Sequence, residues 1–321
     1  MKRSAIQIGF LLWGVNLTLF LIFSRAHADP ITAQAERNNT VIRLSRSRYD
    51  ISTLALRPGA AIIGEGWSNN SNVGHGGHEW STLEGSVIHC AGSGVCVSYI
   101  PQAHRPSPVH LENLAIIGDG QGTGLQLGDA SHTPVFGTLS NVLIANFSTG
   151  LSFAGEDFNF NGLFLQANEV GLSITTTTAN ENCWYGLRLQ HNGIGLSITS
   201  GYELNFFGGL VQSDRVGMLI GTCSNCEFEG FDFEANTNAG IINRGDSNLF
   251  INNRFAGGQG DNFRIESGEH CVLLGNRVMG ANQMFIGKLA HDTVLLGNTF
   301  NGIVDKSKDT ISVGNVVLKV R

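Results

Sequence analysis

The sequence predicts an all-β protein, a right-handed parallel β-helix of about ten to twelve coils with a coil length near 22 residues. Residues 162–174 read GLFLQANEVGLSI and residues 186–198 read GLRLQHNGIGLSI, so nine of thirteen residues recur at the same offsets. Glycines before an apolar run recur at intervals of 26, 21, 24, 22 and 23 residues, at Gly124, Gly150, Gly171, Gly195, Gly217 and Gly240. The strings GNRV at 275, GNTF at 297 and GNVV at 314 continue the period. The repeat therefore fills most of the chain without a linker.

The residues between the glycines favour strands over helices. WYGLRLQHNGI fits the core of a leucine-rich repeat, which would continue into a helical segment. Here the chain continues GLSITTTTANEN and GLSITSGYEL, which are rich in β-branched residues, Gly, Asn and Thr. We therefore expect each coil to run strand, turn, strand, turn.

The first 28 residues have the features of a secretory signal peptide. Lys2 and Arg3 precede the largely apolar segment 6–23, and Ala26-His27-Ala28 is a small-x-small cleavage site before Asp29. The alternative is a retained membrane anchor, which Gln7, Asn16 and Thr18 would weaken. We expect a secreted or periplasmic protein with one β-helix domain over residues 29–321. Irregular opening coils and a loop should occupy residues 29–108, and regular coils residues 109–321.

Composition limits the classes of partner. Charged residues make up 14% of the chain and its formal net charge is −6, with 42 glycines. This balance disfavours nucleic acid and anionic membranes, both of which select basic surfaces. No motif points to a cofactor or to a metal: CSNC at 223–226 lacks a second pair of ligands at finger spacing. In an exported chain Cys90 with Cys96, and Cys223 with Cys226, are each placed to close a small loop, whereas Cys183 and Cys271 suit the core.

The repeat also predicts which residues stack in the interior. One inward column comprises Leu165, Leu189, Val211, Phe233, Phe255, Val278 and Phe300, and a second, mostly aromatic column comprises Phe160, Trp184, Phe206, Phe228, Phe250, Leu273 and Leu295. An aromatic column also suits a platform for sugars, but the two leucines that continue it favour core stacking. Asn168, Asn192, Asp214 and Asn236 follow the first strand, where their side chains can bond the backbone of neighbouring coils.

These residues resemble the pectin-lyase-like superfamily of right-handed β-helices, in particular pectate-lyase-3-type proteins and bacteriophage tailspike domains. The resemblance covers about residues 50–315 and rests on LRPGAAIIGEGW, STLEGSVIHCAGSG, VHLENLAIIGDGQGTGLQLGDAS and NVLIANFSTGLSF. It implies a polysaccharide partner and one of several roles, since such proteins include lyases, glycosidases, epimerases and inert adhesins.

The catalytic signatures of that superfamily are missing from this chain. There is no adjacent Asp-Asp pair, no Asp-Pro-His-His and no Asp-His motif, and the nearest string to Arg-Ile-Lys is RIE at 264. Gly74-His75-Gly76 matches a polygalacturonase string, but it lies in the loop before the regular coils and not after an acidic pair. A site must therefore be inferred from the outward columns.

Two outward columns of the first strand carry the candidate site. One reads Phe164, Arg188, Leu210, Asp232, Arg254, Arg277, Thr299, and its neighbour reads Gln166, Gln190, Gln212, Glu234, Ala256. Asp232 and Glu234 stand two residues apart on one strand, so their Cα atoms are about 6.5–7 Å apart, and such a pair suits the acid and base of glycoside hydrolysis. Arg188, Gln190, Gln212 and Arg254 are the predicted substrate-binding residues, with the arginines facing a uronate carboxylate. The alternative is that these charges only pair with each other across a solvent-facing sheet.

The loop over residues 67–80 is a second candidate for shaping a cleft. It contributes Trp67, His75, His78, Glu79 and Trp80, although its glycine-rich character equally suits a mobile surface loop. Together these features lead us to expect a glycan lyase or glycoside hydrolase that cuts within an acidic polysaccharide. The alternatives are a non-catalytic glycan-binding or structural β-helix of the cell envelope, and a trimeric fibre; the sequence leaves monomer and trimer open.

Overall fold

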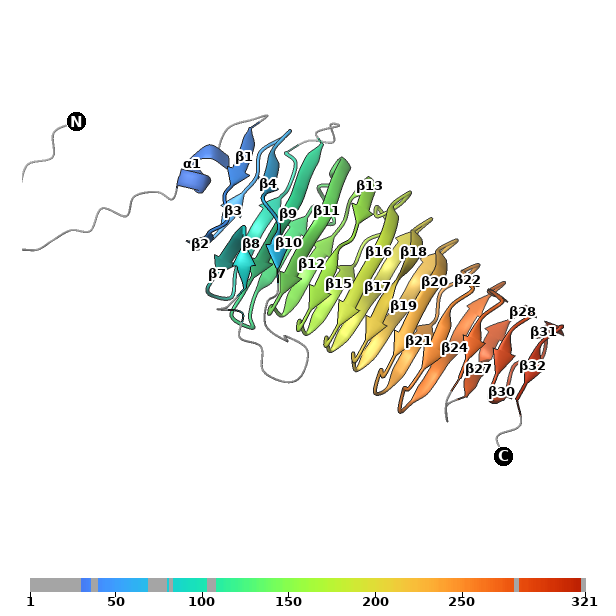
Figure 1. Ribbon diagram of the computed structural model, residues 1–321. Coiled ribbons are helices and arrows are strands. Elements are labelled where there is room, and N and C mark those ends of the chain that lie inside the picture. The colour runs from blue at the N-terminus through green and yellow to red at the C-terminus, as the bar shows by residue number, and fades with distance from the viewer. Residues whose placement is uncertain are drawn as a thin grey trace, which may run out of the picture.

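The computed structural model describes residues 30–35, 40–68, 80, 83–102, 108–279 and 283–318. The coils stack in one row, with helix α1 (Pro30–Ala35) at one end and the last strands at the other (Figure 1). About eleven coils, about 22 residues apart, form this solenoid, which confirms the predicted parallel β-helix and its period. The predicted signal peptide lies outside the described residues. Within the described part of the chain, no helix is long and apolar enough to cross a membrane.

Each coil has three faces, and all pairings between stacked coils are parallel. Face 1 consists of β1 (Val41–Leu44), β4 (Ala61–Gly64), β13 (Glu156–Asn161), β22 (Leu249–Ile251), β25 (Val272–Leu274), β28 (Val294–Leu296), β31 (Ile311–Val313) and the first halves of β9 (Val109–Ile117), β11 (Val135–Ala145), β16 (Cys183–Gln190), β18 (Asn205–Gln212) and β20 (Glu227–Glu234). Face 2 consists of the second halves of those five strands with β2 (Arg48–Ile51), β7 (Val87–Cys90), β14 (Phe164–Gln166), β23 (Arg254–Ala256), β26 (Arg277–Val278), β29 (Thr299–Phe300) and β32 (Val316–Val317).

Face 3 is a separate sheet. It consists of β3 (Leu54–Ala55), β8 (Val95–Tyr99), β10 (Thr123–Leu127), β12 (Thr149–Phe153), β15 (Val170–Ile174), β17 (Ile194–Tyr202), β19 (Val216–Ser224), β21 (Ala239–Asn243), β24 (Asp261–Glu269), β27 (Met284–His291) and β30 (Ile303–Asp305). A short antiparallel pair, β5 (Trp67–Ser68) and β6 (Glu84–Gly85), closes the base of the long loop in the second coil. The six glycines from Gly124 to Gly240 each directly precede an inward residue of a face 3 strand. Gly275, Gly297 and Gly314 instead lie between the face 1 and face 2 strands of their coils.

The expected order of two strands per coil is wrong, because the first strand bends into two faces. The bend lies at a residue with positive φ, such as Gly186 (64°), Gly208 (62°) or Gly230 (71°). Asn252 takes the same place with a φ of 52°. Glycine, and to a lesser degree asparagine, accepts this left-handed conformation without a Cβ clash. Because of this bend, one predicted strand contributes its first half to face 1 and its second half to face 2. We name the bend corner 1–2.

The interior columns are confirmed. Leu189 pairs with Leu165 and Val211, and Trp184 pairs with Phe160 and Phe206, with all six side chains at most 1% exposed. Ring centroids along the aromatic column are 5.4 Å apart for Trp184–Phe206, 5.0 Å for Phe206–Phe228 and 5.2 Å for Phe228–Phe250. The column is therefore core, and its buried area is a main source of stability.

Asparagine side chains form hydrogen bonds between neighbouring coils at two corners. At the corner between faces 2 and 3, Asn192 accepts from the backbone N–H of Asn168 at 3.0 Å and donates to the carbonyl of Leu165 at 3.1 Å. This confirms the predicted role of the Asn168, Asn192, Asp214 and Asn236 set. A second ladder, which the sequence analysis missed, runs along corner 1–2 through Asn253, Asn276, Asn298 and Asn315. These bonds satisfy backbone groups that the turns leave unpaired.

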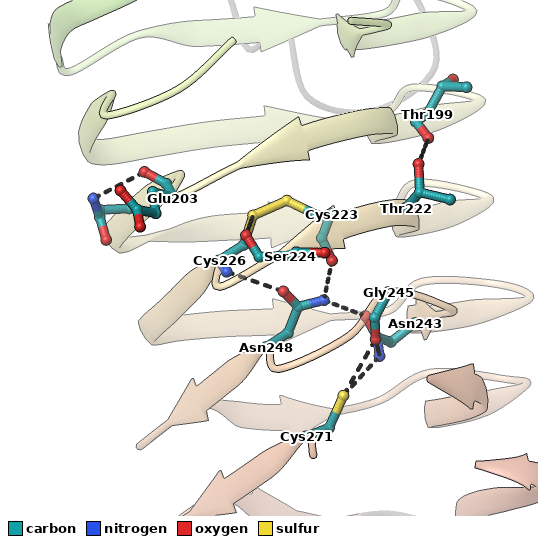
Figure 2. Close-up of a disulfide and its surroundings, with 11 residues drawn as sticks. Thr199, Glu203, Thr222, Cys223, Ser224, Cys226, Asn243, Gly245, Asn248 and Cys271 are labelled. Carbon is teal, nitrogen blue, oxygen red and sulfur yellow. Dashed lines mark hydrogen bonds between the residues drawn. A yellow bond between two sulfur atoms is a disulfide. The ribbon is translucent and has the colours of Figure 1, made fainter. Parts of the chain in front are cut away.

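Disulfides close both predicted cysteine pairs, Cys90–Cys96 and Cys223–Cys226. Figure 2 shows the second pair, where Asn248 donates to the carbonyl of Cys223 at 3.1 Å and accepts from the N–H of Cys226 at 3.0 Å. Cys271 is buried, as expected, and its thiol contacts the carbonyl of Gly245 at 3.3 Å. The expectation of a core position for Cys183 is wrong: this residue is half-buried and occupies an outward position of face 1, paired with Asn205.

Candidate functional site

The six predicted site residues lie together on the outer surface of face 2. The pairing register places Arg188, Leu210, Asp232, Arg254 and Arg277 in one column, and Gln190, Gln212 and Glu234 in the next. The inward neighbours Phe231 and Phe233 are 1% and 2% exposed, so the alternation along β20 turns both carboxylates outward. We call Arg188, Gln190, Gln212, Asp232, Glu234 and Arg254 the face 2 strip.

Five of these residues form a continuous chain of hydrogen bonds across four coils. Gln190 Nε2 donates to Gln212 Oε1 at 2.6 Å, and Gln212 Nε2 donates to Glu234 Oε2 at 3.2 Å. Arg254 Nη1 then bridges the two carboxylates, at 3.2 Å from Glu234 Oε1 and 2.6 Å from Asp232 Oδ2. The amides and the guanidinium thus hold both carboxylates in one fixed arrangement.

Electrostatics within the strip centre on Arg254. The Asp232 carboxylate, and to a lesser degree that of Glu234, raises the pKa of the Arg254 guanidinium above its ordinary value. The three side chains are between a third and a half exposed, so solvent screens their ion pairs and limits what they contribute to stability. Asp232 Oδ1, in contrast, is buried and has no hydrogen-bond partner among the described residues. Asp232 and Glu234 therefore both accept hydrogen bonds from the Arg254 guanidinium, and Asp232 Oδ1 accepts none from the described residues.

Arg188 stands outside this chain. Its guanidinium carbon lies 5.0 Å from the centroid of the Phe164 ring, in a cation–π contact. The structure gives Arg188 no carboxylate partner within the described residues, and the side chain is exposed. Its charge is therefore available to an anionic group from outside the protein.

Aromatic residues that flank the long loop of the second coil cover the N-terminal end of the same face. Trp80, 7% exposed, packs in a cluster with Ala115 and Leu143, which are outward residues of face 2. Trp67 joins this cluster, lies 6.0 Å from the Phe164 ring and donates from Nε1 to the carbonyl of Asn141 at 3.1 Å. The face 2 strip therefore begins next to this cluster, at the Phe164 ring that Trp67 and Arg188 both contact. The loop residues His75, His78 and Glu79, and the Gly74-His75-Gly76 string, lie outside the described residues.

A polar cluster that the sequence analysis missed lies at the N-terminal end of face 2. His89 is 2.7 Å from Asp50 Oδ1 through Nδ1 and 3.0 Å from Asp119 Oδ1 through Nε2. Arg48 lowers the pKa of the Asp50 carboxyl by donating to it, and the His89 contact acts in the same direction. The three residues are 39 and 30 positions apart in the chain, so only the coil register brings them together. Their mutual pairing ties the first three coils to one another.

No arrangement in the described residues resembles a metal centre. Across residues 30–35, 40–68, 80, 83–102, 108–279 and 283–318, no group of three or more His, Cys, Asp and Glu side chains is placed to hold an ion.

Comparison with known proteins rests on structure alone, since no protein-family model matches the chain and no curated protein matches its sequence. DFA-IIIase from Arthrobacter chlorophenolicus A6 aligns with a TM-score of 0.62 at 13% identity, covering 88% of this chain and 80% of that one. The A-module of the Azotobacter vinelandii mannuronan C-5 epimerase AlgE6 aligns with a TM-score of 0.58 at 13% identity, covering 88% and 91%. The chain has the pectin-lyase-like β-helix fold.

A tailspike shares this fold as well. Tailspike protein 2 of the Escherichia coli O157:H7 bacteriophage CAB120 aligns with a TM-score of 0.56 at 13% identity. The alignment covers 85% of this chain but only 42% of the tailspike, so the chain spans less than half of that protein's length. At these identities the likeness establishes the fold and leaves activity to be argued from the site.

Proposed function

We propose that this protein is exported and acts on polysaccharide along face 2, as a lyase or hydrolase that cuts within an acidic chain. The face 2 strip is the observation that carries the proposal. It places the carboxylate pair and its bridging guanidinium on adjacent coils, and the unpaired Arg188 two coils from Asp232, at about 4.8 Å per coil. An extended strip of this kind suits a polymer better than a small molecule, because a solenoid offers a long surface instead of a deep pocket.

The contacts of the strip favour elimination over hydrolysis. Hydrolysis by a carboxyl pair requires that one member carry a proton to the leaving group. Both Asp232 and Glu234 accept from Arg254, an arrangement suited to ionised acceptors. A lyase needs one base and a cation that stabilises the charge developing on the uronate carboxylate. In this proposal Asp232 acts as base through Oδ2, its accessible oxygen, beside Glu234, and Arg254 and Arg188 face uronate carboxylates of the bound chain.

The alternative function is glycan binding without catalysis, as an envelope protein or a trimeric fibre. The missing superfamily signatures and the partial exposure of the Asp232, Glu234 and Arg254 side chains favour it. The structural likeness to a tailspike supports the fibre form, and a monomeric mass in solution would count against that form.

Assays against a panel of acidic and neutral polysaccharides separate these functions. The proposal expects new reducing ends or unsaturated products from an acidic polysaccharide, and none after Arg188→Ala with Arg254→Ala. Binding of the acidic polysaccharide without any cleavage would establish the alternative. Neither binding nor cleavage across the acidic panel would contradict both.

A further inference from the structure

Face 1 carries an outward aromatic pair, with one ring exposed and the other half-buried, that the face 2 proposal does not use. Tyr185 and Phe207 occupy paired outward positions of β16 and β18, with ring centroids 5.4 Å apart and planes inclined by 21°. Tyr185 is 45% exposed, whereas the inward neighbours Trp184 and Phe206 are fully buried. The two rings therefore stack on each other along the row of coils and form an apolar platform on the outside of the solenoid.

Hydrogen-bonding groups flank this platform on both sides along the stack of coils. Asn161 precedes Tyr185 in the same outward column, and Glu229 follows Phe207. In the neighbouring outward column Asn159 and Glu227 take the equivalent places, two residues earlier on the same strands. From Asn161 to Glu229 the register spans three coil steps, or about 14 Å at the usual strand spacing. An apolar platform between amides and carboxylates matches a pyranose ring, which has an apolar face and a rim of hydroxyl groups.

The charge of face 1 selects the kind of sugar. Among the described residues, the outward positions of face 1 from β9 to β31 contain no Lys or Arg, while Glu112, Glu227 and Glu229 are acidic. Partial burial, together with the neighbouring Glu229 carboxylate, raises the pKa of Glu227. An anionic sugar would meet only like charge here, in contrast to the cationic end of the face 2 strip at Arg188.

We infer that Tyr185 and Phe207, with Asn159, Asn161, Glu227 and Glu229 around them, form a second glycan-binding site specific for neutral pyranose units. The site lies on a different face from the strip and takes a different class of sugar, so it does not depend on catalysis at Asp232 and Glu234. Glycan chains that carry both neutral and acidic units would be held on two faces of the same coils.

Calorimetry with neutral β-1,4-linked hexasaccharides tests this inference directly. The probes are cellohexaose, xylohexaose and mannohexaose, each titrated into the full-length mature protein. Wild type should bind at least one of them, and Tyr185→Ala or Phe207→Ala should weaken that binding by about tenfold or more, as truncation of an aromatic anchor does. Tyr185→Phe keeps the ring and should retain most of the affinity.

Two control variants make the result specific. Leu274→Ala removes another exposed apolar side chain of face 1, 41% exposed and three coils beyond Phe207, and should leave binding unchanged. Arg188→Ala should also leave neutral-sugar binding unchanged while it impairs binding of acidic glycans. If wild type binds none of the three hexasaccharides, or if Tyr185→Ala and Phe207→Ala bind as wild type does, the inference is wrong. Either result leaves the face 2 proposal standing.

Discussion

Asp214 is the one carboxylic acid in a ladder of amides. Its Oδ1 accepts from the backbone N–H of Asn192 at 2.6 Å and from Asn192 Nδ2 at 3.1 Å, while its Oδ2 is buried with no partner among the described residues. Burial raises the pKa of Asp214 to about 8. A neutral acid fits this place, because its hydroxyl can act as donor where the neighbouring asparagines donate to a backbone carbonyl.

This pKa makes stability depend on pH with a definite sign. The folded pKa lies above the unfolded value of 3.8, so the fold favours the protonated form of Asp214. The stability that this group contributes is complete below about pH 4 and is lost as pH rises through about 8. We expect the melting temperature of wild type to fall between pH 5 and pH 9 for this reason.

Asp214→Asn should remove that dependence. Its amide can donate to the carbonyl of Leu189, as Asn192 and Asn236 donate to Leu165 and Val211. We expect a gain of roughly 1–3 kcal/mol at pH 9, the usual cost of one unpaired buried polar group, and little change at pH 5. Thermal unfolding of both proteins at the two pH values measures this, and parallel pH profiles would contradict the assignment.

Within single elements, alternation of inward and outward residues decides the role of each aromatic side chain. Phe206 and Phe207 are adjacent in β18, yet Phe206 is fully buried and stacked between Trp184 and Phe228, whereas Phe207 faces outward against Tyr185. Phe206→Ala should therefore cost about 3–5 kcal/mol in the free energy of unfolding. Phe207→Ala should cost less than about 1 kcal/mol. Denaturant titration of the two variants compares them, and equal losses would show that the register of β18 is wrong.

The same alternation explains how far the sequence predicts these elements. The inward columns follow from a period that every coil must keep, since each residue packs on its equivalent one coil away. The division of the first strand into two faces could not be predicted from this period. It depends on one residue with positive φ in each coil, such as Gly186, and a glycine at that place is equally typical of an ordinary turn. Tyr185 and Phe207 were missed because they adjoin the buried Trp184 and Phe206 and resemble part of the same core run. The six strip residues were found because their columns, once aligned, concentrate the charge of a weakly charged chain.

Across the whole molecule, the strands of each coil pair only with those of adjacent coils, and the two ends differ in how well their core is covered. Helix α1 closes the N-terminal end, with Ile31 and Ala35 only 5% and 1% exposed against the core. At the other end Ile311, Val313, Val316 and Val317 are all more than half exposed in the last coil. In such quasi-one-dimensional folds the stability of a coil depends on its own packing and that of adjacent coils.

Ile31→Ser should accordingly loosen one end of the solenoid and leave the middle intact. We expect faster amide exchange in β1 and β4, and unchanged exchange in β17 to β20, because local opening involves only the coils beneath the helix. Hydrogen exchange of the two proteins, resolved by peptide, measures the difference. Uniform acceleration along the whole chain would indicate one cooperative unit and contradict this account.

The central claim is that Asp232 and Glu234 on face 2 carry out the chemistry. Both side chains point outward from a buried Phe231 and Phe233, so replacing them should leave the core unchanged and alter stability by no more than about 0.5 kcal/mol each. The decisive measurement is the rate of cleavage by the Asp232→Asn, Glu234→Gln double variant on an acidic polysaccharide that wild type cleaves, together with its melting temperature. We predict that the rate falls by orders of magnitude while the melting temperature barely moves. Full activity in the double variant would show that the carboxylates only balance Arg254 and that the site lies elsewhere.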